Sequence, residues 1–181
     1  MTIKKLSTPQ VPLNIFKLAV LVSGRGSNLQ AIMDSIDREE LDAHLSIVIS
    51  NTKDAMALKR AEKHEIKTIF IDPSNYSSSK EYDKALVLKL KEFSIDLICL
   101  AGYMRILGEE IIQTFEKKII NIHPSLLPAF PGLNAQKQAI NHGVKFSGCT
   151  VHFVDSGVDS GPIILQTVVP VYDNDDEKSL S

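Results

Sequence analysis

Apolar and polar positions along the chain follow two alternating patterns. Short runs of β-branched and other apolar residues, which are typical of strands buried on both faces, predict strands at residues 16–22, 45–50, 68–71, 97–100 and 118–122. Segments with apolar residues at helical spacing lie between these runs and predict helices at residues 27–36, 55–64 and 80–93. Strands that alternate with helices indicate right-handed crossovers and a parallel sheet.

The pattern changes after Pro131. Residues 149–154 and 162–171 predict two further strands, and only the turn DSGVDSG separates them. This turn leaves no room for a crossover helix, so the two strands should pair as an antiparallel hairpin that extends the sheet. We therefore expect an α/β fold with a Rossmann-like mixed sheet, parallel in its N-terminal part and antiparallel in its C-terminal hairpin.

Composition and charge narrow the possible functions. The 181 residues fit one domain, and the net charge of −2 gives no argument for binding nucleic acid or an anionic membrane. No run approaches the roughly 18 apolar residues of a membrane-spanning helix, so we expect a cytoplasmic protein with a flexible leader at residues 1–14. Cys99 and Cys149 lie in apolar contexts without CxxC spacing, which favours buried free thiols over a disulfide or a zinc site.

The segment SGRGSN at residues 23–28 joins the first predicted strand to the first predicted helix. Its glycines permit positive φ angles, and the following helix N-terminus offers unpaired N–H groups, which together suit a phosphate. The segment is neither GxGxxG nor a P-loop, so it favours one phosphate over a pyrophosphate. The alternative is a tight turn in which Ser27 or Asn28 caps the helix.

Ligands of parallel α/β sheets bind beyond the carboxyl ends of the strands, and three unusual segments should meet there. They are SGRGSN, AGYMRIL and NIHPSLLP. Asn121 and His123 are two residues apart at a strand end, so their side chains share one face and could stabilise a developing oxyanion. Alternatively they only tie down a turn. Leu127–Pro128 is our candidate for a cis peptide bond.

The predicted hairpin turn supplies two carboxylates, Asp155 and Asp159. A carboxylate beside a histidine can orient the ring and relay a proton, although such turns also occur without a function. Spacing does not choose between the two aspartates. No metal-ligand spacing is present. We expect the other histidines to be structural, as in the strand (His152), to lie at a solvated helix end (His142), or to lie at the surface (His44 and His64).

Taken together, the segments LVSGRGSNLQAI, LAGYMRIL, INIHPSLLPAFPG and GCTVHFVDSGVDSGPII resemble the phosphoribosylglycinamide formyltransferase family in their order and spacing. The resemblance covers residues 17–172. It implies a single formyltransferase domain at residues 15–181 and an enzyme of de novo purine synthesis. Such an enzyme transfers the formyl group of 10-formyltetrahydrofolate, its co-substrate, to the amine of glycinamide ribonucleotide.

The resemblance also implies roles for individual residues. It matches the catalytic triad to Asn121, His123 and Asp159, and so selects Asp159 over Asp155. It matches the phosphate loop to Gly26, Ser27 and Asn28, and the wall of the folate pocket to Met104, Arg105, Ile106 and Leu107. For the last run, a strand end with core side chains is the simpler alternative. The implied partners are small molecules, with no metal, nucleic acid or membrane, and the chain would be a monomer or homodimer.

Two departures from the family stand out. Asn134 occupies a position where many relatives carry histidine. The family also continues through another helix that contacts the ribonucleotide, whereas here residues 174–177 look like a helix start and the chain stops at Ser181. We therefore expect a domain truncated at its C-terminal helix.

Three other functions share part of this pattern. Formyltetrahydrofolate hydrolase shares the triad but uses water in place of the amine, and it typically has an extra N-terminal domain and no SGRGSN loop. Methionyl-tRNA formyltransferase shares the HPSLLP-type segment but adds a basic C-terminal domain. A non-catalytic nucleotide-binding module would keep the phosphate loop without needing Asn121, His123 and Asp159.

Overall fold

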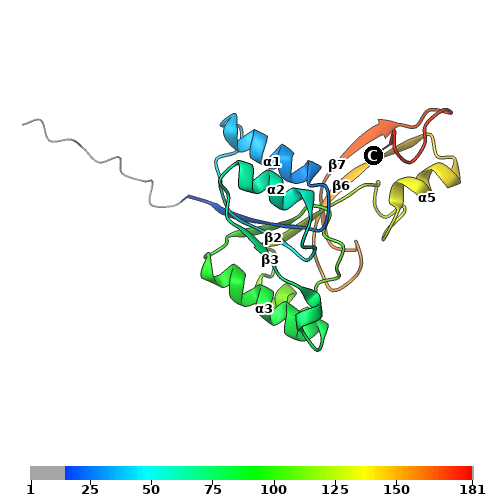
Figure 1. Cartoon of the computed structure of the whole chain (residues 1–181). Helices are drawn as coiled ribbons and strands as arrows, with labels where there is room; N and C mark the ends of the chain where they lie inside the picture. The colour runs from blue at the N-terminus through cyan, green and yellow to red at the C-terminus, as the bar shows by residue number, and fades with distance from the viewer. Residues whose placement is uncertain (1–14, 181) are drawn as a thin grey trace, which may run out of the picture.

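The computed structural model describes residues 15–180 and contains one mixed sheet with helices on both of its faces (Figure 1). The expected leader at residues 1–14 lies outside the described residues. The strands are β1 (Lys17–Val22), β2 (His44–Ser50), β3 (Thr68–Phe70), β4 (Leu97–Leu100), β5 (Ile119–His123), β6 (Phe146–Phe153) and β7 (Ile163–Pro170). The helices are α1 (Ser27–Asp37), α2 (Met56–Lys63), α3 (Ser79–Glu92), α4 (Glu109–Thr114) and α5 (Ala135–His142), with a 3-10 turn at Pro73–Asn75.

The sheet has the order β3-β2-β1-β4-β5-β6-β7. All pairs from β3 to β5 are parallel, whereas β5–β6 and β6–β7 are antiparallel. This confirms the predicted parallel part and C-terminal hairpin. Because the strand order reverses between β1 and β4, the loops that follow these strands diverge at a topological switch point, where α/β sheets bind ligands.

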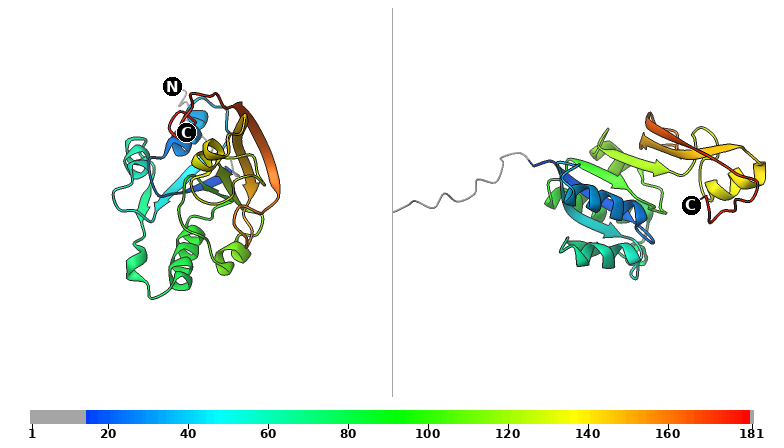
Figure 2. Two further views of the ribbon diagram at one scale, coloured as in Figure 1. Left: turned by 90° about the vertical axis from the view of Figure 1, so that its right-hand side faces the viewer. Right: turned by 90° about the horizontal axis from the view of Figure 1, so that it is seen from above.

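Two apolar cores hold the sheet between its helices, as the alternation within β1 illustrates. Leu18, Val20 and Val22 face the core shared with α1 and α2, whereas Ala19 and Leu21 face the core shared with α3 and α4. Figure 2 shows α5 at the end of the molecule that carries β6 and β7. No helix within residues 15–180 is long and apolar enough to span a membrane.

The predicted elements differ from the observed ones mainly at their ends. Most strands agree to within a residue or two, but β6 begins at Phe146 rather than at 149. The short helix α4 was not predicted, whereas α5 ends at His142, where an exposed helix end was expected. The expected helix start at residues 174–177 is only a turn, in which the Asp176 carboxylate accepts from the backbone N–H groups of Lys178 and Ser179. The predicted cis bond at Leu127–Pro128 is present.

Candidate active site

The carboxylate of Asp159 joins Asn121 and His123 in one cluster. Its Oδ2 lies 3.2 Å from His123 Nδ1 and accepts a 2.8 Å hydrogen bond from the backbone N–H of Gly132. Its Oδ1 accepts a hydrogen bond of 3.3 Å from Asn121 Nδ2. The structure therefore brings together three side chains that are up to 38 residues apart in the sequence.

Local structure explains why Asp159 and not Asp155 faces this cluster. The Asp155 carboxylate accepts from the backbone N–H of Gly157 and from the hydroxyl of Ser160, so it stabilises the turn itself. Asp159 has a left-handed φ of 52°, which aspartate tolerates better than most residues. Residues with this backbone conformation are enriched at functional sites, and here it accompanies a carboxylate turned towards β5.

Both ring nitrogens of His123 face acceptors. Nδ1 faces the Asp159 carboxylate at 3.2 Å, and Nε2 lies 2.8 Å from the backbone carbonyl oxygen of Phe130. Two acceptors are satisfied only by two N–H donors, which the imidazolium form supplies. The ring is 5% exposed, so the neighbouring carboxylate and carbonyl, rather than solvent, face its two nitrogens.

A second buried histidine, His152, completes the cluster. Its Nδ1 donates to the carbonyl oxygen of Phe153 at 2.9 Å, so the neutral ring has an accepting Nε2. Asn121 Nδ2 lies 3.2 Å from this Nε2, and Asp159 Oδ1 lies 3.6 Å from it. The prediction of a buried structural histidine holds, but it missed the contact with the site. Only the antiparallel register, which pairs Asn121 with His152, could have indicated that contact.

The loop after β1 leaves the start of α1 without a side-chain cap. Gly26 is the N-cap residue, with a left-handed φ of 75°, and makes no side-chain hydrogen bond to the first turn. The alternative in which Ser27 or Asn28 caps the helix is therefore wrong, because both lie within α1. Backbone N–H groups at such an uncapped start can bind an anion.

The α2 side of the molecule holds this loop in place. A Cβ atom on Gly26 would lie 2.6 Å from the Cβ of Ala57, so the loop after β1 and the first turn of α2 are in close contact at this position. The backbone N–H of Ala57 donates to the carbonyl of Gly24, and Arg60 Nε donates to the carbonyl of Arg25 at 2.9 Å. The loop is therefore closely supported by α2.

The loop after β4 is attached to the loop after β1. The Ser23 N–H donates to the carbonyl of Gly102 at 3.1 Å, and the Ser23 hydroxyl accepts from the Met104 N–H at 2.8 Å. Met104 and Ile106 are 65% and 74% exposed, whereas Leu107 is buried in the core beneath α3 and α4. The core alternative thus fits Leu107 but not Met104. The strands β1, β4 and β5 are parallel neighbours in the sheet, so the three predicted segments that follow them lie together at the carboxyl ends of these strands.

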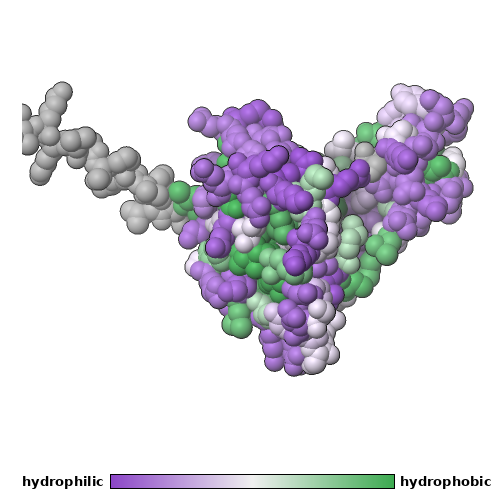
Figure 3. Space-filling model, in the orientation of Figure 1, coloured by the Kyte–Doolittle hydropathy of each residue, from purple (hydrophilic) through white to green (hydrophobic). Residues whose placement is uncertain are grey.

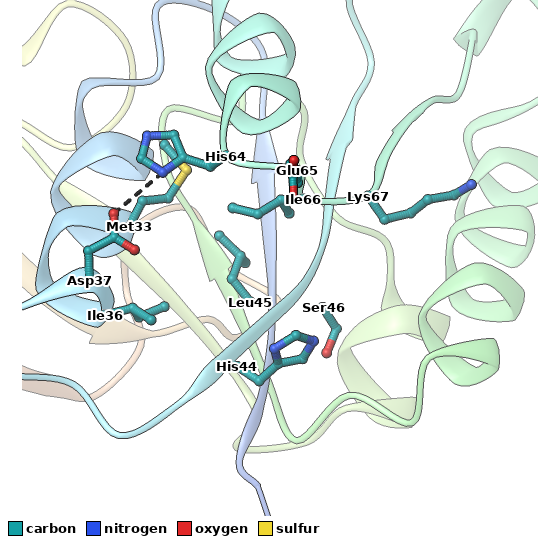
Figure 4. Close-up of a pocket in the computed structure, with 10 residues that line it drawn as sticks. All are labelled: Met33, Ile36, Asp37, His44, Leu45, Ser46, His64, Glu65, Ile66 and Lys67. Carbon is teal, nitrogen blue, oxygen red and sulfur yellow. Dashed lines mark ion pairs between the residues drawn. The ribbon is translucent and has the colours of Figure 1, made fainter. Parts of the chain in front are cut away.

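The space-filling view shows a hollow between the α1–α2 side and the arm of the molecule that carries β6, β7 and α5 (Figure 3). A different hollow, of about 390 Å³, lies at the opposite ends of the strands, where β2 and β3 begin (Figure 4). The ion pair between His64 and Asp37, at 3.4 Å, closes one side of it. This second hollow is remote from the cluster around Asp159, because it lies at the amino ends of the strands.

The described residues contain no group of histidine, cysteine and acidic side chains that could hold a metal ion. Cys99 and Cys149 are free, as predicted, but both are only half-buried. Burial raises the pKa of the Cys99 thiol to about 11, so this thiol is a poor nucleophile at neutral pH.

Comparison with known proteins identifies related chains. The family model described as formyl transferase matches residues 16–181. The phosphoribosylglycinamide formyltransferase of Bacillus subtilis is 42% identical over 159 residues, which are 88% of this chain and 82% of that protein. The human trifunctional purine biosynthetic protein adenosine-3 is 50% identical over 165 residues, which are 91% of this chain but only 16% of that protein.

Solved structures agree with the fold. A glycinamide ribonucleotide transformylase 1 from Symbiobacterium toebii superposes with a TM-score of 0.90 at 48% identity, over 92% of this chain and 78% of the other. This confirms the predicted mixed α/β fold. The chain spans 12% to 17% of the length of six trifunctional relatives, and so corresponds to one segment of those longer proteins.

Proposed function

Because this chain belongs to the formyl transferase family, we propose that it transfers the formyl group of 10-formyltetrahydrofolate to the amine of glycinamide ribonucleotide. The products are formylglycinamide ribonucleotide and tetrahydrofolate. The contact of both Asn121 and His123 with the one carboxylate of Asp159 carries this proposal. It provides hydrogen-bond donors for an oxyanion and a proton acceptor within a single cluster.

The two substrates occupy different loops in this proposal. The ribonucleotide phosphate binds the backbone of Gly26, Ser27 and Asn28, where the uncapped start of α1 offers N–H groups and a favourable dipole. The pterin-like ring of the folate lies along residues 104–107. The hydrogen bond between Ser23 and Met104 supports a common site, because it joins these two loops directly.

The reaction proceeds by direct attack of the neutral amine on the formyl carbon. Asn121 and the His123 imidazolium stabilise the oxyanion of the tetrahedral intermediate, and Asp159 keeps the imidazole ring oriented and charged. A proton moves from the attacking nitrogen, with the help of Asp159, to the folate nitrogen as the bond between that nitrogen and the formyl carbon breaks. The formyl group thus changes nitrogen without a covalent bond to the enzyme.

The observed hydrogen bonds suggest where the formyl oxygen binds. His123 Nε2 donates to the carbonyl of Phe130, and both amide hydrogens of Asn121 face acceptors in Asp159 and His152. An oxyanion is a stronger acceptor than a backbone carbonyl. In this proposal the formyl oxygen replaces the Phe130 carbonyl as the acceptor at His123 and replaces His152 Nε2 as the acceptor at Asn121. This exchange gives the interaction its preference for the charged intermediate.

The test is to mix the protein with 10-formyltetrahydrofolate and to record the absorbance change with and without glycinamide ribonucleotide. We expect loss of the formyl group only when the amine is present, with formation of formylglycinamide ribonucleotide. Formyl loss at the same rate without the amine, with release of formate, would instead indicate a hydrolase. No formyl loss in either mixture would indicate a non-catalytic nucleotide-binding protein.

A further inference from the structure

Two adjacent residues of α3, Tyr82 and Asp83, are almost fully buried although both are polar. Their exposed fractions are 1% and 3%. A buried polar group destabilises a protein unless it is well bonded, so such a pair is expected to have a specific partner. For both residues that partner is the segment of residues 103–108, which follows β4.

Tyr82 holds the first part of this segment. Its hydroxyl lies 2.8 Å from that of Tyr103, and the Arg105 guanidinium carbon lies 4.5 Å from the centre of its ring. Burial raises the pKa of both phenols, so both hydroxyl groups stay protonated at neutral pH and can share a hydrogen bond. The Nε atom of Arg105 is buried without a hydrogen-bond partner, which indicates that stacking on Tyr82 holds this side chain inward.

Asp83 holds the last part of the segment. Its Oδ2 accepts a 2.8 Å hydrogen bond from the backbone N–H of Gly108, the N-cap residue of α4. A Cβ atom at position 108 would lie 2.4 Å from this oxygen, so the carboxylate takes the space that any other side chain would need. The segment is thus fixed to α3 at Tyr103, Arg105 and Gly108.

Two side chains between these anchors, those of Met104 and Ile106, point the other way, whereas Leu107 is buried in the core. Met104 and Ile106 alternate with the anchored residues and are among the most exposed apolar side chains of the described residues. Anchoring of the inward-facing positions therefore determines where the outward-facing edge of residues 104–107 lies. This edge is the one assigned above to the folate.

We propose that Tyr82 and Asp83 are positioning residues for the folate subsite and act through the backbone of residues 103–108. This inference rests on the proposed function, because it takes residues 104–107 as the folate wall. Neither side chain touches the substrate. They maintain the shape of a surface that must fit a flat ring, and pre-organised surfaces bind more tightly because less ordering accompanies binding.

The test compares Tyr82→Phe and Asp83→Ala with two controls in the full 181-residue chain. Asp83→Asn keeps an oxygen that can accept from Gly108. Tyr76→Phe removes a hydroxyl from the ring that packs edge-on against Tyr82, 5.5 Å away. Calorimetric titration gives Kd for 10-formylfolate, a stable oxidised form of the substrate, and for glycinamide ribonucleotide. Thermal unfolding is recorded for every variant.

Loss of one hydrogen bond should raise the Kd for 10-formylfolate about two- to tenfold in Tyr82→Phe and about tenfold in Asp83→Ala. Asp83→Asn should recover most of this loss, and Tyr76→Phe should stay within about twofold of the wild type. The Kd for the ribonucleotide should change less than the Kd for 10-formylfolate in every variant, because its phosphate loop follows β1 and meets residues 103–108 only at the hydrogen bond between Ser23 and Met104.

Unchanged folate affinity in Tyr82→Phe and Asp83→Ala would overturn the inference, as would equal weakening of both ligands. If Asp83→Ala does not fold, Tyr82→Phe against Tyr76→Phe decides alone. Failure of the proposed function would look different. The wild type would then bind 10-formylfolate, with the expected order among the variants, but would not transfer the formyl group to the ribonucleotide.

Discussion

Replacement of Asp159 by asparagine removes the charge around which the site is organised while keeping the shape of the side chain. Asparagine has one oxygen where aspartate has two. If its NH₂ group takes the place of Oδ2, it meets the N–H groups of His123 and Gly132. If the NH₂ group takes the place of Oδ1, it meets the amide N–H of Asn121. In either orientation a donor faces a donor, and the imidazolium of His123 loses its anionic partner.

The size of the effect follows from the bonds that are lost. A hydrogen bond to a charged group contributes about 1.5–3 kcal/mol, and the substitution weakens the ion pair with His123 and at least one of the hydrogen bonds from Asn121 and Gly132. A loss of about 3 kcal/mol from transition-state stabilisation corresponds to roughly a hundredfold decrease in kcat. The KM values should change far less, because neither substrate depends on Asp159 for its main contacts.

The assay is steady-state formyl transfer at saturating concentrations of both substrates. Asp155→Asn is the matched control, since Asp155 belongs to the same turn but bonds only to Gly157 and Ser160 among the described residues. We expect this control to keep kcat within about threefold of the wild type. The reasoning is refuted if Asp159→Asn retains normal kcat, or if both substitutions decrease it equally.

Three further predictions follow from other parts of the structure. Gly26→Ala places a methyl group 2.6 Å from the Cβ of Ala57, and position 26 has a positive φ that alanine rarely adopts, so the substitution should raise KM for the ribonucleotide and lower Tm. An unchanged KM would argue against a phosphate loop. Burial raises the pKa of Cys99 to about 11, so this thiol should react slowly with a disulfide reagent at pH 8 and rapidly after unfolding. Fast labelling of Cys99 in the native protein would contradict this prediction. Burial raises the pKa of Asp83, so the Asp83 carboxyl stays protonated to a higher pH in the folded chain than in the unfolded chain. The resulting stabilisation is present at low pH and is lost as the pH rises above about 4. Urea unfolding across pH should therefore show wild type losing stability relative to Asp83→Asn as the pH rises, and a constant or opposite difference would contradict this.

Much of the fold could be predicted because its signals are local. The buried parallel strands are continuous apolar runs, and a short turn between two such runs allows only a hairpin. The short helices α4 and α5 lack a long amphipathic pattern, so only the end of α5 at His142 could be expected. The alternative in which Ser27 or Asn28 caps α1 fails because Gly26 adopts a left-handed φ and is itself the N-cap residue.

The site was predictable only in part because its contacts are not local. Asn121 and His123 share a strand, so their common face follows from spacing. Asp155 and Asp159 share a turn, and spacing alone could not show which of them faces the histidine. His152 enters the site through the register of β5 and β6, which depends on how two strands meet rather than on either sequence.

The central claim is that Asp159 and His123 act as one unit in formyl transfer. The most direct test is a double-mutant cycle in which kcat/KM is measured for the wild type, His123→Ala, Asp159→Asn and the double variant. We predict that the double variant loses no more activity than the worse of the two single variants, because either substitution already dismantles the unit. Losses that multiply in the double variant would mean that the two side chains act independently, and would contradict this account.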